Sequence, residues 1–149
     1  MVYLDTEHKD RLGRLLGITG KMMRRTLSRN LSEKGFDLTA EQAILLWHLS
    51  TDEGVTHKMV AECFDHDKVG ITRWVDALES QDLVIRVPDR SDRRQKLVYL
   101  TEKGKKTCEA ILPVFDLTQQ QAVKGIDDER LQILKELLKA ICDNLGESD

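Results

Sequence analysis

The spacing of the apolar residues changes near the middle of the chain, and this change constrains the fold more than any other feature. Apolar residues at i, i+3, i+4 and i+7 predict a helix with one buried face, made by Ile71, Trp74, Val75 and Leu78. From Leu83 onward the pattern alternates, in LVIRV at 83–87 and KLVYL at 96–100, which predicts two strands. The segment between them, PDRSDRR at 88–94, is polar and cationic. The sequence therefore predicts a helix followed by a β-hairpin with a charged tip.

Two further helices are predicted before this one. Thr39 and Gln42 have the spacing of a capping box, and the apolar run AILLWHL at 43–49 indicates a helix that is buried on all sides. Thr56 can cap a short helix whose apolar face carries Met59, Val60, Cys63 and Phe64. Two short helices after a third, joined by a tight turn and followed by a hairpin, are typical of a winged helix-turn-helix. We place this region at 39–101.

Long helices are expected on both sides of that region. In the first third, leucines and methionines recur at helical spacing, although three glycines weaken the pattern and Gly35 ends it. Thr101 is expected to cap a helix from Glu102 towards Lys124, and Asp127 or Asp128 to start a last one. That last helix carries an apolar seam of Leu131, Leu134, Leu138, Ile141 and Leu145, whose steps of three and four require another helix against it.

The expected fold class is thus mainly α, with a winged helix-turn-helix, a small antiparallel hairpin as its wing, and N- and C-terminal helices that form a dimerisation domain. The 149 residues are interpreted as one chain, 1–149, with dimerisation helices at 1–35 and 102–149. No linker is visible that would separate two independent domains.

The charge of the chain is uneven. The net charge is −3, which counts against a non-specific nucleic-acid coat. Residues 54–106 carry 11 basic and 9 acidic side chains, whereas the rest carries 12 and 17. A mildly basic middle between acidic ends suits a protein that touches phosphates through one module, although chance fluctuation explains the same numbers.

Composition also bounds the location of the protein. The first residues, MVYLDTEHKDR, are charged where a signal peptide needs an apolar stretch, and no run is long enough to span a membrane. Three widely spaced cysteines suit reduced thiols better than disulfides. We expect a soluble, cytoplasmic protein without membrane contact.

The middle of the chain resembles the MarR family of winged-helix regulators (multiple antibiotic resistance regulators). The resemblance is carried by DKVGITRWVDALESQDLVIRV at 67–87 and by PDRSDRRQKLVYLTEKG at 88–104. It implies a transcription regulator, expected to be a repressor, that binds double-stranded DNA as a homodimer on a pseudo-palindromic operator. In two places the chain departs from the family: Val69-Gly70 replaces a usual Ser-Thr, and Asp82 replaces a usual Gly. Asp82 tolerates a left-handed helix end less easily than glycine does.

Helical geometry selects the side chains that would face a DNA groove. With the apolar stripe inward, Val69, Thr72, Arg73 and Asp76 point outward, and the N-terminal part of a recognition helix makes most base contacts. The groove candidates are therefore Lys68, Val69, Gly70, Thr72 and Arg73. Asp76 either lies too far along the helix to reach the bases or orients Arg73. Gly70 either allows the helix to approach a DNA strand closely or reflects random sequence drift. An ordinary solvated helix face is the alternative.

The hairpin tip and the start of the preceding helix supply the other DNA candidates. Arg90, Arg93 and Arg94 can enter a narrow minor groove, and Asp89 and Asp92 are expected to hold arginines by bidentate pairs. By resemblance, Asp92 and Arg94 are the brace and Arg90 the minor-groove probe, although the residues alone leave this assignment open. The helix start at Thr56, His57 and Lys58 can accept a phosphate, or can be a plain cap.

A small-molecule effector is implied by the resemblance, because ligands of the family, often phenolic or anionic, bind between these regions and weaken DNA binding. Met22, Met23, Trp47 and His48 are the pocket candidates, and core packing is the alternative role for them. The rival functional class is a winged helix that binds protein and not DNA.

We expect no enzyme activity, cofactor or metal. The sequence contains no nucleophile–base pair and no glycine-rich cofactor turn. His57, Cys63 and His66 have ligand-like spacing, but Cys63 belongs to an apolar face and is expected to be a small buried residue.

Overall fold

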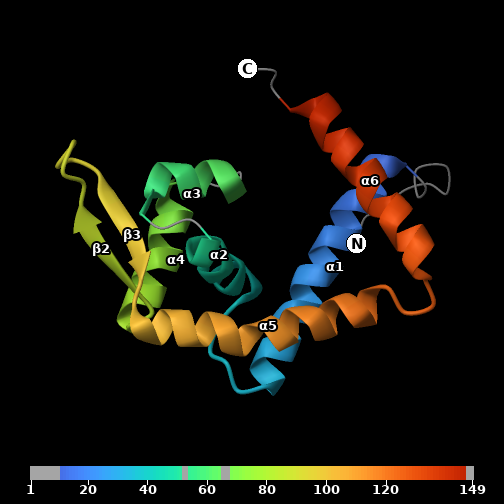
Figure 1. The fold of residues 1–149 in the computed structure, drawn as a ribbon, viewed down its shortest axis with the longest axis horizontal. Coiled ribbons are helices and arrows are strands. Elements are labelled where there is room, and N and C mark those ends of the chain that lie inside the picture. The colour runs from blue at the N-terminus through green and yellow to red at the C-terminus, as the bar shows by residue number, and fades with distance from the viewer. Residues whose placement is uncertain (1–10, 52–53, 65–67, 147–149) are drawn as a thin grey trace.

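The computed structural model describes residues 11–51, 54–64 and 68–146, and the side chains of His57, Cys63, Phe64 and Lys68 lie outside this description. Within these ranges the chain forms six helices and three strands (Figure 1). The helices are α1 (Leu12–Glu33), α2 (Ala40–Thr51), α3 (His57–Phe64), α4 (Lys68–Ser80), α5 (Glu102–Ala122) and α6 (Asp128–Leu145). The strands are β1 (Val55–Thr56), β2 (Val84–Pro88) and β3 (Lys96–Leu100). The predicted fold class is confirmed.

Helix α2 lies at the centre of the hydrophobic core. Its buried residues are Ala40, Ala43, Leu45, Leu46 and Leu49. Helices α1, α4 and α5 all contact α2 and add buried side chains, namely Leu27, Leu31, Ile71, Val75, Leu78, Cys108, Ile111 and Val114. This agrees with the prediction of a buried helix, with the exception of Trp47, whose side chain is 43% exposed.

The three strands form an antiparallel sheet in the order β1-β3-β2. Arg86 of β2 and Val55 of β1 both pair with Val98, the middle residue of β3. The hairpin of β2 and β3 was predicted, whereas β1 was not, because two residues are too few to show alternation. Strand β1 ties the start of α3 to the sheet.

The helix starts follow the predicted capping residues. The backbone amide of Gln42 donates to Thr39 Oγ1 (3.2 Å), and the amide of Thr39 donates to Gln42 Oε1 (3.0 Å), which completes the capping box. Thr101 Oγ1 accepts from the amide of Gly104 (2.9 Å) at the start of α5. Asp127 caps α6 in the same way.

Two helices end with the same backbone motif. Gly35 after α1 has φ +84° and Asp82 after α4 has φ +64°, so both lie in the left-handed region. In each case the next residue donates its amide to the carbonyl five positions back, at 2.9 Å and 3.0 Å respectively. Asp82 thus adopts the left-handed cap that the sequence predicted, without the freedom of a glycine.

Gly104 lets the start of α5 approach the strand β2 closely. A Cβ atom at this position would lie 2.1 Å from the carbonyl oxygen of Leu83. The same carbonyl accepts the backbone amide of Thr101 (3.1 Å). Only glycine fits here, and this contact fixes the angle at which α5 leaves the sheet.

Helix α5 connects the two ends of the molecule, running from the foot of the β-hairpin towards α6 (Figure 1). Near its C-terminal end it packs on α1, where the buried Asn30 donates through Nδ2 to Thr118 Oγ1 (3.0 Å) and to Gln121 Oε1 (2.9 Å). Burying a polar amide in this way is favourable only with its partners in place, so the pair sets the register between α1 and α5.

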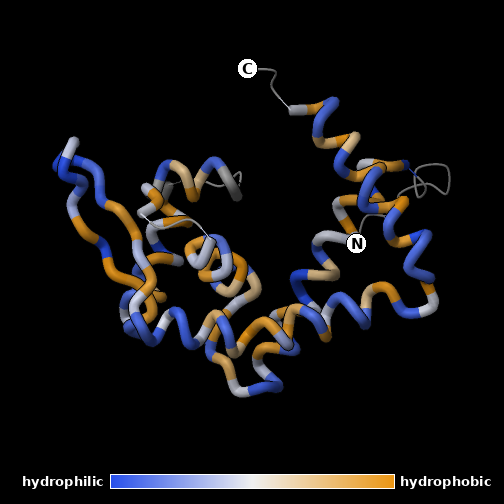
Figure 2. The backbone as a smooth tube through the Cα atoms, in the orientation of Figure 1, coloured by the Kyte–Doolittle hydropathy of each residue, from blue (hydrophilic) through white to orange (hydrophobic). Residues whose placement is uncertain are grey.

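Helix α6 buries none of its residues within this chain. Apolar residues recur along α6 and along the first half of α1 (Figure 2). The exposed ones are Leu12, Leu15, Leu16, Ile18, Met22, Met23, Ile133, Leu134, Leu137 and Leu145. Among the described helices, none combines the length and the apolar character that crossing a membrane requires.

Candidate nucleic-acid interface

The outward face of α4 is the one that helical geometry predicted. Ile71, Val75 and Leu78 are fully buried, whereas Val69 is 63% exposed and Arg73 is exposed as well. Thr72 is half-buried between these faces. The chain therefore presents an apolar and a cationic side chain together on the first half of this helix. Gly70 is half-buried in the same turn, and the side chain of Lys68 lies outside the described residues.

The start of α3 uses Thr56 as a cap. Thr56 Oγ1 accepts from the backbone amide of Met59 (3.1 Å), and Lys58 in the first turn is exposed. The side chain of His57, which the sequence grouped with them, lies outside the described residues. The plain capping role of Thr56 is confirmed, and the exposed Lys58 places one cation beside the helix start.

The wing consists of β2, β3 and the connection 89–95, and all three of its arginines are exposed. Its aspartates do not hold those arginines, contrary to the prediction: in the described chain, no ion pair joins Asp89 or Asp92 to a wing arginine. Asp89 Oδ1 accepts from the amide and the hydroxyl of Ser91 (3.0 and 2.9 Å). Asp92 Oδ1 accepts from the amide of Arg94 (3.0 Å).

The aspartates therefore brace the backbone of the wing, because a short carboxylate reaches the amide two residues on more readily than a guanidinium across the turn. The guanidinium groups of Arg90, Arg93 and Arg94 remain at the surface, available for phosphates.

An ion-pair cluster that the sequence analysis missed joins α4 to β2. Arg86 Nη2 donates to Asp76 Oδ1 and to Glu79 Oε1 (3.0 Å), and Arg86 Nε donates to Glu79 Oε2 (3.2 Å). Asp76 was expected to orient Arg73 or to lie too far along the helix; its partner is Arg86. The hydrogen bonds from Arg86 lower the pKa of the Glu79 carboxyl, so Glu79 stays ionised.

Among the cavities lined by described residues, the four candidate effector residues are divided between separate ones, as far as they line any. Met22 and Met23 line a cavity of about 550 Å³ against α5, together with Arg29 and Lys124. Trp47 lines a different cavity of about 280 Å³. His48 lies against the edge of the Trp47 ring, with the ring centroids 5.3 Å apart.

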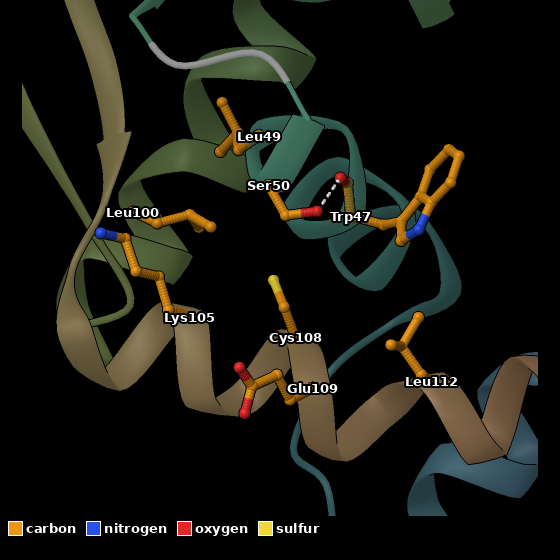
Figure 3. A pocket seen from close by; sticks show the side chains of 8 residues that line it. All are labelled: Trp47, Leu49, Ser50, Leu100, Lys105, Cys108, Glu109 and Leu112. Carbon is orange, nitrogen blue, oxygen red and sulfur yellow. Dashed lines mark hydrogen bonds between the residues drawn. The ribbon is translucent and has the colours of Figure 1, made fainter.

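The cavity beside Trp47 lies between α2 and α5, and the thiol of Cys108 points into it (Figure 3). Cys108 Sγ donates to the carbonyl of Leu46 (3.3 Å). Burial, and to a smaller extent the charge of Glu109, raise the pKa of this thiol. A protonated, hydrogen-bonded thiol is a poor nucleophile, so Cys108 fits the role of a core residue.

Metal ligation finds no support in the described part of the chain. No group of three histidine, cysteine, aspartate or glutamate side chains comes together there to hold an ion. His66 and the side chains of His57 and Cys63 lie outside the described residues, so the ligand-like spacing of these three stays untested.

Comparisons with known proteins agree with this geometry. The family model of the MarR family matches residues 36–95. The multiple antibiotic resistance protein MarR of Salmonella typhimurium is 30% identical over 132 residues, which covers 87% of this chain and 90% of that protein. A mutant of MarR from E. coli, solved in complex with operator DNA, has a TM-score of 0.81 and 28% identity, covering 93% of this chain and 99% of its own. CouR from Rhodococcus jostii, bound to p-coumaroyl-CoA, has a TM-score of 0.78 and 26% identity, with coverages of 94% and 97%.

Proposed function

The chain belongs to the MarR family of transcription regulators, and from this premise we propose that it binds DNA sequence-specifically as a homodimer. The observation that carries the proposal is that the exposed side of α4, with Val69 and Arg73, lies next to the wing. Helix α4 contacts β2, the first strand of the wing, and the tip of the wing carries exposed arginines. Such a helix fits the major groove, and such a wing fits the adjacent minor groove. A mutant of MarR from E. coli, 28% identical to this chain, was solved in complex with operator DNA, which supports DNA binding by this chain.

The homodimer is supported by the apolar surface of α1 and α6. Ten leucines, isoleucines and methionines on α1 and α6 are exposed, which is more apolar surface than a monomeric protein normally presents to water. Packing α1 and α6 against those of a second copy buries this surface. A two-fold dimer then presents two α4 helices, which requires half-sites with centres about 10 base pairs, or a multiple of that, apart.

Selection from a random-sequence duplex pool tests the proposal. The wild-type chain should enrich a pseudo-palindromic sequence, and its affinity for that duplex should fall steeply with salt. Arg73→Ala should weaken binding to the enriched duplex by about 1–3 kcal/mol, the range for losing one base contact, with the fold unchanged by circular dichroism. Absence of any salt-sensitive DNA binding would favour the rival class, a winged helix that binds protein.

We propose that the chain acts as a regulator and not as an enzyme, which its similarity to named transcription regulators supports. Because its proposed partner is the chromosome, we place it in the cytoplasm. Neither the proposed regulatory role nor the proposed location requires a cofactor. The described residues bring together no metal-binding cluster.

We propose in addition that the chain represses transcription and is released by a small anionic, partly apolar effector. The cavity of about 550 Å³ supports the binding of such an effector, because it combines Met22 and Met23 with the cations Arg29 and Lys124. A ligand that prefers the DNA-incompetent state shifts the dimer towards it by no more than its affinity difference between the states. A reporter behind the enriched site should be silent with the protein and active with protein plus an aromatic carboxylate. If no compound of this class restores expression, these residues serve packing alone.

A further inference from the structure

Arg86 is a half-buried cation on the edge strand β2. It lies on β2 between Val84 and Pro88 and pairs with Val98 in the middle of the sheet. Its side chain is 19% exposed, unlike the exposed arginines of the wing tip. The guanidinium contacts Glu79 with two nitrogens and Asp76 with one of them. Arg86 is thus directed at α4 and away from the DNA-facing tip.

The two acids that Arg86 binds belong to the helix proposed to enter the major groove. Asp76 follows Thr72 and Arg73 by one turn on the outer side of α4, and Glu79 follows Asp76 by three residues. Left alone, two carboxylates at this position would repel the phosphates on both sides of the groove. Pairing with Arg86 neutralises part of that charge and holds the carboxylates against β2.

The same contacts join the two elements that would touch different grooves. Helix α4 and the wing are linked in the chain only by the short segment 81–83, so their relative angle depends on contacts made across space. A guanidinium that binds a carboxylate with two parallel hydrogen bonds fixes direction as well as distance, which a lysine cannot do.

We infer that Arg86 is a positioning residue that sets the angle between α4 and the wing, and thereby the ability of the protein to distinguish its operator from other DNA. This inference rests on the proposed function. Phosphate contacts give affinity for any sequence, whereas base readout needs the helix at a defined depth and angle in the groove. Loss of the Arg86 contacts therefore removes discrimination before it removes general affinity.

The test compares two dissociation constants for each variant, one for the duplex enriched by the wild type and one for a scrambled duplex of equal length. Arg86→Gln should lower the ratio of scrambled to enriched constants about tenfold, roughly the discrimination of one good base contact. The salt slope should stay that of the wild type, because Arg86 releases no phosphate counterion. The matched control is Arg130→Gln on α6, which removes an exposed arginine and should leave the ratio unchanged.

A second variant separates the angle from simple charge and also covers the case in which Arg86→Gln does not fold. Asp76→Asn with Glu79→Gln keeps the side-chain shapes and removes two negative charges. Charge alone predicts tighter binding to both duplexes by the same factor. Our inference predicts tighter binding to scrambled DNA together with an approximately tenfold lower ratio.

Two results would overturn the role assigned to Arg86. One is that the ratio of the dissociation constant for scrambled DNA to that for enriched DNA stays at the wild-type value in either folded variant. The other is an Arg86→Gln protein that loses affinity for both duplexes equally and loses one unit of salt slope, which would make Arg86 a phosphate ligand. A wild-type protein that enriches no sequence at all would instead contradict the proposed function itself.

Discussion

Val69 is the residue of the proposed interface that is hardest to explain as part of the core, since it is 63% exposed on the outer face of α4. An apolar side chain entering the major groove finds a matching partner in the methyl group of thymine. Gly70 beside it adds no side chain and so leaves room for a close approach of this turn to a DNA strand.

Val69→Ser should therefore relax the preference for thymine at one operator position. The expected size is about 1 kcal/mol, because a single apolar contact is lost and not a bidentate pair. Binding to an operator panel in which each thymine is replaced by uracil measures this directly, as only the methyl group is removed. The wild type should be weakened at one position and Val69→Ser at none. If no uracil matters to the wild type, Val69 reads no thymine and α4 enters the groove differently.

Asp82 pays a conformational cost at the left-handed end of α4, where φ is +64°. Asp82→Gly should stabilise the protein by about 0.5–1 kcal/mol, the relief of left-handed strain less the extra backbone entropy of glycine when unfolded. Gly35→Asp is the matched control, because Gly35 has φ +84° in the same motif and no atom near its Cβ position. That variant should lose a similar amount. Urea unfolding at one fixed protein concentration measures both, and equal signs for the two variants would contradict the explanation.

At the scale of the elements, periodicity and capping residues predicted much of the fold. The stripe from Ile71 to Leu78, the capping box at Thr39 and the cap at Thr101 are all present as expected. Each of these features involves residues within one or two turns of each other, which is why a sequence alone can reveal them.

Features that depend on contact between elements were missed. Strand β1 exists only because β3 lies beside it, and two residues carry no period. In the sequence, Arg86 looks like one more polar residue of an alternating strand. Asp76 and Glu79 become evident as its partners only once β2 is packed against α4. The wing aspartates were assigned the wrong partners, because their composition does not distinguish a backbone brace from an arginine brace. The outward position of Arg73 was predicted correctly; its contact with DNA stays a prediction.

The wing as an element should contribute affinity more than sequence choice. Arg90→Ala should weaken binding to the operator and to random DNA by similar factors and should lower the salt slope by about one unit, because one phosphate contact is lost. Titrations of both duplexes at several salt concentrations measure the two effects, with Arg93→Ala and Arg94→Ala as comparisons within the same hairpin. A changed preference at one major-groove base with an unaltered slope would show that the hairpin is placed incorrectly.

At the scale of the whole molecule, the exposed apolar faces of α1 and α6 predict that the folded unit is a dimer. Sedimentation should give about twice 17.1 kDa, with no folded monomer after dilution to nanomolar concentrations. Leu134→Glu with Leu138→Glu places charges in the seam of α6 and should yield monomers or unfolded chains. Lys135→Glu with Lys139→Glu changes the neighbouring polar positions and should leave the mass unchanged. A stable wild-type monomer that binds DNA tightly would contradict the dimer and the architecture proposed from it.

The length of the continuous helix α5 affects which spacing between operator half-sites the dimer would accept. This one helix of 21 residues is about 31 Å long and joins the foot of the wing to the region of α6. Taken as one rigid body, even with Pro113 in its interior, a helix of that length that turns by only 5° at the dimer end moves its other end by about 3 Å, close to the rise of one base pair. The close contact at Gly104 and the Asn30 hydrogen bonds hold α5 near its two ends, and its contact with α2 holds the part between them. The protein would then be sensitive to the distance between the half-sites. When the spacer between them is lengthened one base pair at a time, the affinity should show a sharp optimum, and Asn30→Ala should broaden that optimum.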